Sequence, residues 1–186
     1  MKEFLQSYHP VSEKLLEEYV ALWQPFSASK KSLLTMAGDT ERYLYFVKEG
    51  IQKSYYSNDG RQHVMFFTYA PSFSGIVESF LTQTVSKYYF ETITDSDFVR
   101  IGYDRHEEML RKYHELDTLY RKITEAALAG LIEKQHELLA FSVEERFKVF
   151  VRRSAHLLNR VSQKDIASYL RIDQTNFSKL MNSGLI

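Results

Sequence analysis

Residues 161–180 read VSQKDIASYLRIDQTNFSKL, and this segment predicts how the C-terminal part of the chain folds. Ser162 and Asp165 have the spacing of a capping box, in which a hydroxyl accepts a backbone N–H and an acidic side chain reaches back. Ile166 and Leu170 share one helix face, and the small Ala167 between them allows a second helix to cross closely. The pattern predicts a short helix that begins after Ser162.

A second short helix is predicted after a turn at Ile172. Asp173 is a suitable N-cap, and Phe177, Leu180 and Met181 recur at helical spacing and face inward. The residues left on the outer face are polar groups and one cation that can hydrogen-bond to base edges, namely Gln174, Thr175, Asn176, Ser178 and Lys179. Two crossed helices of this kind are typical of a helix-turn-helix that enters the major groove of DNA.

The charge of the chain is unevenly distributed, although the formal net charge is zero. Residues 142–186 hold eight Lys/Arg and four Asp/Glu, whereas residues 1–141 hold 16 basic and 20 acidic residues. A basic segment on an acidic body is expected where one end of a protein faces phosphates. A helix is predicted over 143–158, and we expect its Arg152 and Arg153, together with Ser162 and Gln163, to contact DNA.

A long helix is predicted from Asp104 to about Ala140, because this range has helical periodicity and no proline. One set of its residues follows a spacing near 3.5, typical of a helix that pairs with another helix. We expect a parallel homodimer through this helix, and the alternative is a helix packed on its own domain. The expected interface consists of Leu116, Leu119, Ile123, Ala127, Gly130 and Leu131.

The N-terminal half begins with an amphipathic helix over 12–23 and changes to period-two alternation between about 30 and 103. Short strands rich in aromatic and β-branched residues are separated by turn signals such as Asn58-Asp59-Gly60. Strands of this length and spacing predict an antiparallel sandwich or closed barrel. The fold class is therefore α+β, with a β-barrel or jelly roll followed by helices.

Composition excludes several classes of function. The chain has no cysteine, so disulfides, iron–sulfur clusters and thiolate zinc sites are excluded. No signal peptide or membrane-spanning run is present in the sequence, and we expect a cytoplasmic protein. No catalytic residues or metal ligands are expected, because the six histidines are scattered and no nucleophile lies in a supporting pattern. A cupin-type barrel enzyme would need several inward histidines, and the barrel has only His63.

The stretch quoted above resembles the helix-turn-helix of the Crp–Fnr superfamily of regulators, with its Gln-x-Asp-Ile-Ala-x-x-Leu pattern over 163–170. The barrel glycines Gly38, Gly50, Gly60 and Gly75 resemble the turn glycines of its cyclic-nucleotide-binding fold. The resemblance covers roughly residues 30–182. It implies a sensor barrel over 1–104, a dimerisation helix over 105–141 and a DNA-binding domain over 142–186. It also implies regulation of transcription as a DNA-binding homodimer, with RNA polymerase as a further partner.

Two departures from the family concern the DNA-binding domain. The family usually has glycine where Arg171 stands, and an arginine with positive φ costs on the order of 1 kcal/mol. The β-hairpin wing that often follows the family's helix-turn-helix is missing or truncated, so some phosphate contacts are expected to be lost.

The family's ligand pocket holds the ribose with a Gly-Glu pair and the cyclic phosphate with an arginine followed by Ser or Thr. Here the first element reads Gly75-Ile76-Val77-Glu78, and the second reads Thr84-Val85-Ser86-Lys87, without arginine. We therefore expect another small effector, or none, rather than cyclic AMP or any cofactor. The residues expected to line an equivalent site are Gly75, Glu78, Ser79, Ser86 and Lys87.

The sequence thus predicts a sequence-specific DNA-binding transcription regulator. A sensor or scaffold module whose helical domain contacts proteins instead of DNA remains the alternative. DNA binding that falls steeply with salt would favour the first.

Overall fold

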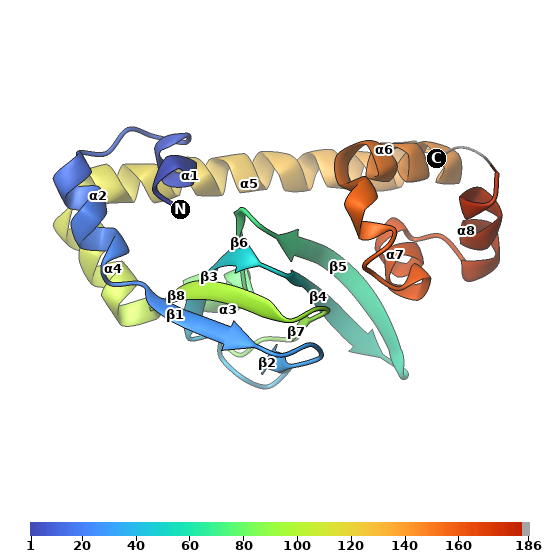
Figure 1. Cartoon of the computed structure of the whole chain (residues 1–186), viewed down its shortest axis with the longest axis horizontal. Coiled ribbons are helices and arrows are strands. Elements are labelled where there is room, and N and C mark those ends of the chain that lie inside the picture. The colour runs from blue at the N-terminus through green and yellow to red at the C-terminus, as the bar shows by residue number, and fades with distance from the viewer. Residues whose placement is uncertain (184–186) are drawn as a thin grey trace. The chain divides into compact units, whose positions relative to one another are not determined.

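A computed structural model describes residues 1–183 of the chain (Figure 1). The N-terminal half contains α1 (Lys2–Gln6), α2 (Glu13–Val20), eight strands and the short helix α3 (Val77–Thr82). The strands are β1 (Gln24–Ala28), β2 (Leu33–Thr35), β3 (Tyr43–Glu49), β4 (Ile51–Asn58), β5 (Arg61–Tyr69), β6 (Ser72–Ser74), β7 (Tyr89–Thr92) and β8 (Ser96–Gly102). The C-terminal half contains α4 (Tyr103–Lys112), α5 (His114–Ala140), α6 (Val143–Ser154), a 3₁₀ turn (Ala155–Leu157), α7 (Gln163–Leu170) and α8 (Gln174–Met181).

The strands form two four-stranded sheets, in the orders β1-β8-β3-β6 and β2-β7-β4-β5. This is the jelly roll that the sequence predicted, in an α+β chain. The hairpin predicted at Asn58-Asp59-Gly60 is confirmed, because β4 and β5 are joined by Asp59 and Gly60 with φ of 48° and 73°. Gly38, Gly50 and Gly75 also have positive φ, as expected for turn glycines.

The helix predicted from Asp104 to Ala140 is interrupted, and this part of the prediction is wrong. Tyr113 has an extended backbone, with φ −128° and ψ 106°, and separates α4 from α5. Its hydroxyl lies 3.0 and 3.1 Å from the two carboxylate oxygens of Glu18. This contact joins residues 95 positions apart, and the helical periodicity of the range gave no sign of the break.

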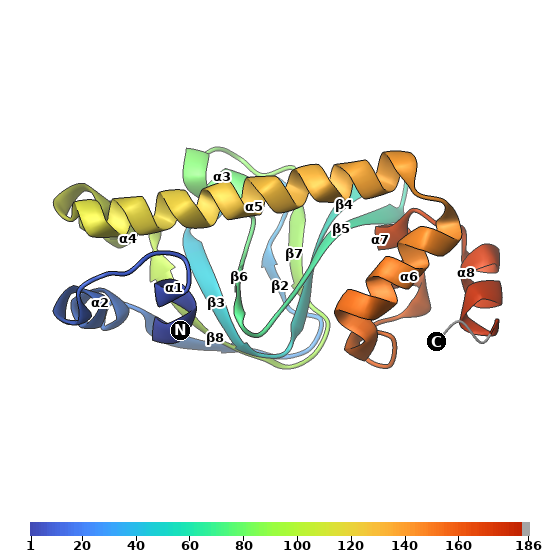
Figure 2. The same cartoon turned by 90° about the horizontal axis from the view of Figure 1, so that it is seen from above.

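The chain divides into two compact units, residues 1–54 with 67–127 and residues 55–66 with 128–186, which we describe separately. The helix α5 contributes residues to both compact units. The boundary between the units therefore differs from the predicted domain limits at 104 and 141. These functional domain limits stay a prediction. In the first unit, α1, α2 and α4 lie beside the start of α5 in both views (Figure 1, Figure 2).

The first unit has an apolar core on each face of the β1-β8-β3-β6 sheet. On the outer face, Leu44, Phe46 and Ile101 pack with buried residues of the helices. On the inner face, Tyr45, Val47 and Phe98 pack with Phe90 of the second sheet and with Ile76. The alternation along β3 and β8 follows from the period of two in a strand, which sends successive side chains to opposite faces.

A buried polar cluster joins α2, α4 and α5 within the first unit. The Tyr19 hydroxyl donates to the Tyr120 hydroxyl at 2.8 Å and lies 2.9 Å from His106 Nδ1. His106 is 2% exposed, and burial lowers its pKa to about 4. The imidazole is therefore neutral at pH 7.

We predict that acid destabilises the protein through His106. Its pKa is about 4 in the folded state and about 6.5 when unfolded, so the stabilisation is complete above pH 6.5 and is lost as the pH falls towards 4. The loss is on the order of 3 kcal/mol. Urea denaturation at several pH values should show that the free energy of unfolding falls between pH 6.5 and 4. The fall should be smaller in His106→Phe. It should be unchanged in His156→Gln, which replaces an exposed histidine. An equal fall in His106→Phe would contradict the assignment.

Candidate nucleic-acid interface

The helices α7 and α8 are fixed by N-caps at the positions predicted from sequence. The Ser162 hydroxyl accepts from Asp165 N at 3.1 Å, and the Asp173 carboxylate accepts from Asn176 N at 2.9 Å. Between the helices, Arg171 has φ 54° and ψ 48°, and Ile172 N donates to Ala167 O at 2.9 Å. These contacts close the turn of a helix-turn-helix.

The inward faces of α7 and α8 form the core of the second unit with α6. The predicted inward residues Ile166, Ala167, Leu170 and Phe177 are 0–1% exposed. The Phe147 ring of α6 meets the Phe177 ring edge to face, with centroids 5.7 Å apart. Burial of these side chains orients both helices, because the apolar stripe of each faces a common core.

The outer face of α8 carries the residues expected to contact DNA. Each of Gln174, Thr175, Asn176, Ser178 and Lys179 is exposed. The Asn176 side-chain amide donates to the Asp173 carboxylate, so this residue also supports the cap. Ser162 and Gln163 are exposed at the start of α7, although the Ser162 hydroxyl is occupied by its cap contact. The arrangement presents polar donors, acceptors and one cation on one surface.

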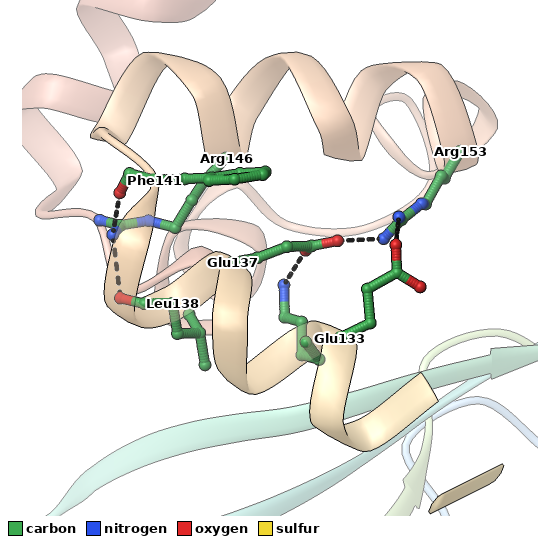
Figure 3. Close-up of polar contacts among 7 residues, drawn as sticks. Glu133, Glu137, Leu138, Phe141, Arg146 and Arg153 are labelled. Carbon is green, nitrogen blue, oxygen red and sulfur yellow. Dashed lines mark hydrogen bonds and ion pairs between the residues drawn. The ribbon is translucent and has the colours of Figure 1, made fainter. Parts of the chain in front are cut away.

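Arg152 and Arg153, both expected at the DNA, differ in their surroundings. Arg152 is exposed and forms no ion pair within the part of the chain that the structure describes. Arg153 contacts Glu133 at 2.9 Å and also Glu137 of α5, and Figure 3 shows its guanidinium directed at both carboxylates. Arg153 therefore joins α6 to α5, and its role as a DNA contact has no support from this geometry.

The same cluster contains two further cations. Glu137 is 4% exposed and lies 3.6 Å from Lys134 Nζ. Arg146 donates to the carbonyl oxygens of Phe141 and Leu138 at 3.0 and 3.5 Å (Figure 3). It also donates to the carbonyl of Arg171 at 3.3 Å. Arg146 thus satisfies carbonyls at the end of α5, which lack intrahelical partners.

We predict that Arg153→Ala destabilises the protein, whereas Arg152→Ala does not. Removal of Arg153 leaves the buried Glu137 with Lys134 alone, and a buried charge that loses a partner costs about 1–3 kcal/mol. Thermal unfolding of the two variants, which remove the same side chain at neighbouring positions, measures the difference. Equal melting temperatures would contradict the assigned role of Arg153.

A contact with the β4–β5 hairpin completes the second unit. The Ser168 hydroxyl of α7 accepts from Val64 N at 3.0 Å and donates to Gln62 O at 3.0 Å. The strand β5 is at the edge of its sheet, where backbone groups lack a neighbouring strand. Ser168 therefore satisfies two backbone groups of an edge strand.

The residues expected to line a ligand site in the barrel do not converge on an open pocket. Ser79 is fully buried, and its hydroxyl accepts from Glu41 N and donates to Thr84 O. Ser86 is 2% exposed, and its hydroxyl contacts Tyr88 N and O. Glu78 and Lys87 are both exposed. Internal hydrogen bonds thus occupy the two serines, and the charged pair faces solvent.

Comparisons with known proteins agree with this architecture. The family model "Cyclic nucleotide-binding domain" matches residues 25–113. FixK2 from Bradyrhizobium japonicum aligns with TM-score 0.74 and 19% identity, covering 87% of this chain and 83% of its own. A putative Crp/Fnr-family transcriptional regulator from Eubacterium rectale aligns with TM-score 0.72 and 12% identity, covering 95% and 87%. A CooA mutant from Carboxydothermus hydrogenoformans aligns with TM-score 0.68 and 16% identity, covering 97% of this chain and 82% of its own.

The chain has the fold of the Crp–Fnr regulators. The resemblance stated from residues 161–180 and from the barrel glycines is thereby confirmed. No curated protein matches the sequence. Within residues 1–183, no helix is both long and apolar enough to cross a membrane, and no three His, Cys, Asp or Glu side chains gather in a way that could hold a metal ion.

In the Crp–Fnr fold of this chain, Arg171 between α7 and α8 has a left-handed backbone conformation. We predict that Arg171→Gly stabilises the protein. Glycine adopts φ 54° without strain, whereas arginine there costs about 1 kcal/mol. Greater freedom of glycine in the unfolded chain offsets part of the gain, so the melting temperature should rise by about 2–4 °C at most. Arg160→Gly, in an exposed turn with negative φ, is the control and should not stabilise. A lower melting temperature for Arg171→Gly would contradict the strain.

The predicted dimer surface of the Crp–Fnr fold requires a correction. Leu116 and Leu119 are 0% exposed in the core of the first unit, and Ile123 packs against that core. Ala127, Gly130 and Leu131 are exposed. The residues with heptad spacing at the N-terminal end of α5 therefore lie on the side of the helix that is buried in its own protomer. For this end of α5, the alternative prediction of a helix packed on its own domain applies.

Two features escaped the sequence analysis. A complete capping box at Ser142 and Glu145 begins α6, and the Ser-x-x-Glu spacing could have identified it. The ion cluster of Arg153, Glu133 and Glu137 joins two helices, and no spacing rule predicts such contacts. The β-hairpin wing, predicted to be missing or truncated, would lie beyond Ser183 and so outside the described residues.

Proposed function

We propose that this chain is a sequence-specific DNA-binding transcription regulator that acts as a homodimer. The observation that carries the proposal is the exposed polar surface of α8, on a helix-turn-helix whose inward residues Ile166, Leu170 and Phe177 are buried. Side chains of this kind near the N-terminus of a recognition helix can bind base edges in the major groove. The exposed Arg152 and the basic charge of residues 142–186 support phosphate contacts.

The proposed dimer surface is the apolar stripe on the C-terminal half of α5. Leu128, Ile132 and Leu139 are 57%, 64% and 77% exposed, and with Gln135 they recur at spacings of four, three and four residues. A stripe of this spacing is typical of helices that pair with one another. Exposed apolar side chains that form a contiguous patch mark interaction sites. Leu131, 46% exposed, borders the stripe.

The proposal implies a protein without catalytic activity that works in the bacterial cytoplasm and contacts RNA polymerase at promoters. The description of one similar structure, a putative transcriptional regulator of the Crp/Fnr family, supports a role in transcription. Cyclic AMP is not proposed as the effector, because the family's phosphate position holds Ser86-Lys87 instead of an arginine. The barrel senses a different small molecule or none.

Selection of bound fragments from a random DNA pool tests the proposal. The purified chain, with and without cyclic AMP, should enrich a pseudo-palindromic sequence whose half-sites are about one helical turn apart. Affinity for this sequence should fall steeply with salt, because phosphate contacts release counterions. A pool that shows no enrichment, with weak binding that ignores salt, would contradict the proposal and favour a module that contacts proteins.

A further inference from the structure

The C-terminal part of α5 meets the helix-turn-helix through polar side chains. Of residues 128–140, all of which the structure describes, Glu137 alone is buried, and its neighbours Lys134 and Leu138 are half-buried. Apolar side chains form the core between α6, α7 and α8, whereas the contact with α5 centres on a carboxylate. Ion pairs and hydrogen bonds therefore hold α5 to the DNA-binding helices.

Lys134 links α5 directly to the first helix of the helix-turn-helix. Its Nζ lies 4.1 Å from the ring centroid of Tyr169 on α7, in addition to its ion pair with Glu137 at 3.6 Å. A cation over an aromatic ring is attracted by the quadrupole of the ring, more strongly where the pair is shielded from water. The Tyr169 ring also lies beside the ring of Phe150 on α6, with centroids 6.0 Å apart. The three helices α5, α6 and α7 thus meet around Tyr169.

Arg146 and Arg153 hold the two ends of α6 to α5 (Figure 3). Arg153, in the last turn of α6, pairs with the two glutamates described above. Arg146, near the start of α6, donates to carbonyls at the end of α5 and to the carbonyl of Arg171 between α7 and α8. Because the contacts lie at both ends of α6, this helix cannot pivot about its short link to α5 while they persist.

We name these contacts the α5 clamp, which consists of Glu133, Lys134, Glu137, Arg146 and Arg153. The clamp lies on the face of α5 opposite the proposed dimer stripe. Glu137 is two residues from Gln135 and two from Leu139, both of which belong to the stripe. Since an α-helix has about 3.6 residues per turn, a step of two residues is slightly more than half a turn. One face of α5 is thus left for a partner, and the other is fixed to the helix-turn-helix.

We infer that the α5 clamp sets the distance between the two DNA half-sites that the dimer can bind, with Lys134 and Arg153 as positioning residues. In a symmetric dimer paired through the stripe, the clamp holds each helix-turn-helix at one angle to the pairing helices. Two recognition helices in fixed positions fit half-sites at one spacing, whereas helices that pivot fit several. This inference rests on the proposed function, because it requires a dimer and a DNA operator.

Operators with altered centres test the inference. Two base pairs are inserted or deleted between the half-sites of the selected operator. Fluorescence anisotropy then measures the affinity of the full chain for each DNA and for a single half-site. The unchanged chain should bind the altered operators about tenfold or more weakly, because its two recognition helices no longer fit both half-sites at once. In Arg153→Ala this loss should shrink to about threefold or less, with an unchanged affinity for the single half-site.

Two further variants separate positioning from general stability. Lys134→Met removes the charge and keeps an unbranched side chain that packs on Tyr169. It should reduce the spacing preference as well, and it decides the question if Arg153→Ala fails to fold. Ser168→Ala is the control, because it removes the contacts of α7 with the β4–β5 hairpin without touching the clamp. It should lower the melting temperature and keep the spacing preference of the unchanged chain.

Three results would overturn the inference. The first is that both clamp variants keep the spacing preference of the unchanged chain. The second is that Ser168→Ala loses this preference to the same extent, since general loosening would then explain it. The third is that the unchanged chain binds all spacings equally. Failure of the proposed function is a different result, in which the unchanged chain binds no selected DNA or binds it as a monomer, and the inference then falls with it.

Discussion

Replacing Gln174 and Lys179 together by alanine should weaken binding to the selected operator by about a hundredfold or more. Both side chains are exposed on α8, and neither donates or accepts a side-chain hydrogen bond within the described residues. A side chain that reads a base contributes about 1–3 kcal/mol of discrimination, and loss of one phosphate contact lowers the salt slope by about one. The fold should persist, because neither residue packs in the core.

The control for this variant uses the same two residue types elsewhere. Lys14 and Gln24 are exposed in the first unit, and their double alanine variant should bind the operator like the unchanged chain. Fluorescence anisotropy at several salt concentrations measures both variants, with circular dichroism as the check on folding. Equal affinities for the two variants would remove α8 from the DNA interface. Asn176 is unsuitable for this test because its amide also supports the cap at Asp173.

Ile132→Asp should convert the dimer to a monomer and lower operator affinity by about a hundredfold or more. Ile132 is 64% exposed at the centre of the α5 stripe, and a dimer interface would bury the new carboxylate without a partner, which costs several kcal/mol. A monomer binds one half-site at a time and loses the gain in affinity from linked binding.

Light scattering during gel filtration measures the oligomeric state, and anisotropy measures DNA affinity. Ile132→Leu is the matched control, because it preserves the apolar side chain and should remain dimeric. A monomeric unchanged chain, or a dimeric Ile132→Asp, would contradict the proposed surface.

The inward and outward residues of α7 and α8 could be predicted because helix amphipathicity and N-caps are local. Ser162 and Asp173 each lie three residues from the backbone N–H that they cap. The strands and the turn at Asp59-Gly60 were predictable for the same reason. The family resemblance then supplied the order of the parts.

Contacts between distant segments explain what the sequence did not reveal. Tyr113, at the break between α4 and α5, contacts Glu18 of a distant helix, and the ion pairs of Arg153 depend on the preceding helix. The heptad spacing of Leu116 and Leu119 is compatible with a dimer interface and equally with the core of their own protomer. Only the packing in the structure distinguishes these two possibilities. Lys134 looked like any polar residue of a helix, because its neighbour Tyr169 comes from another helix.

The Ser168 contact affects how this protein can be cut for expression or recombination. Ser168 bridges to Gln62 and Val64 from more than 100 residues away, and residues 55–66 belong to the same compact unit as α6–α8. A fragment that begins at Leu128 would expose the donor and acceptor of Ser168 to water and lack that hairpin. Chimeras that exchange the helix-turn-helix between regulators should therefore carry the hairpin tip along with it.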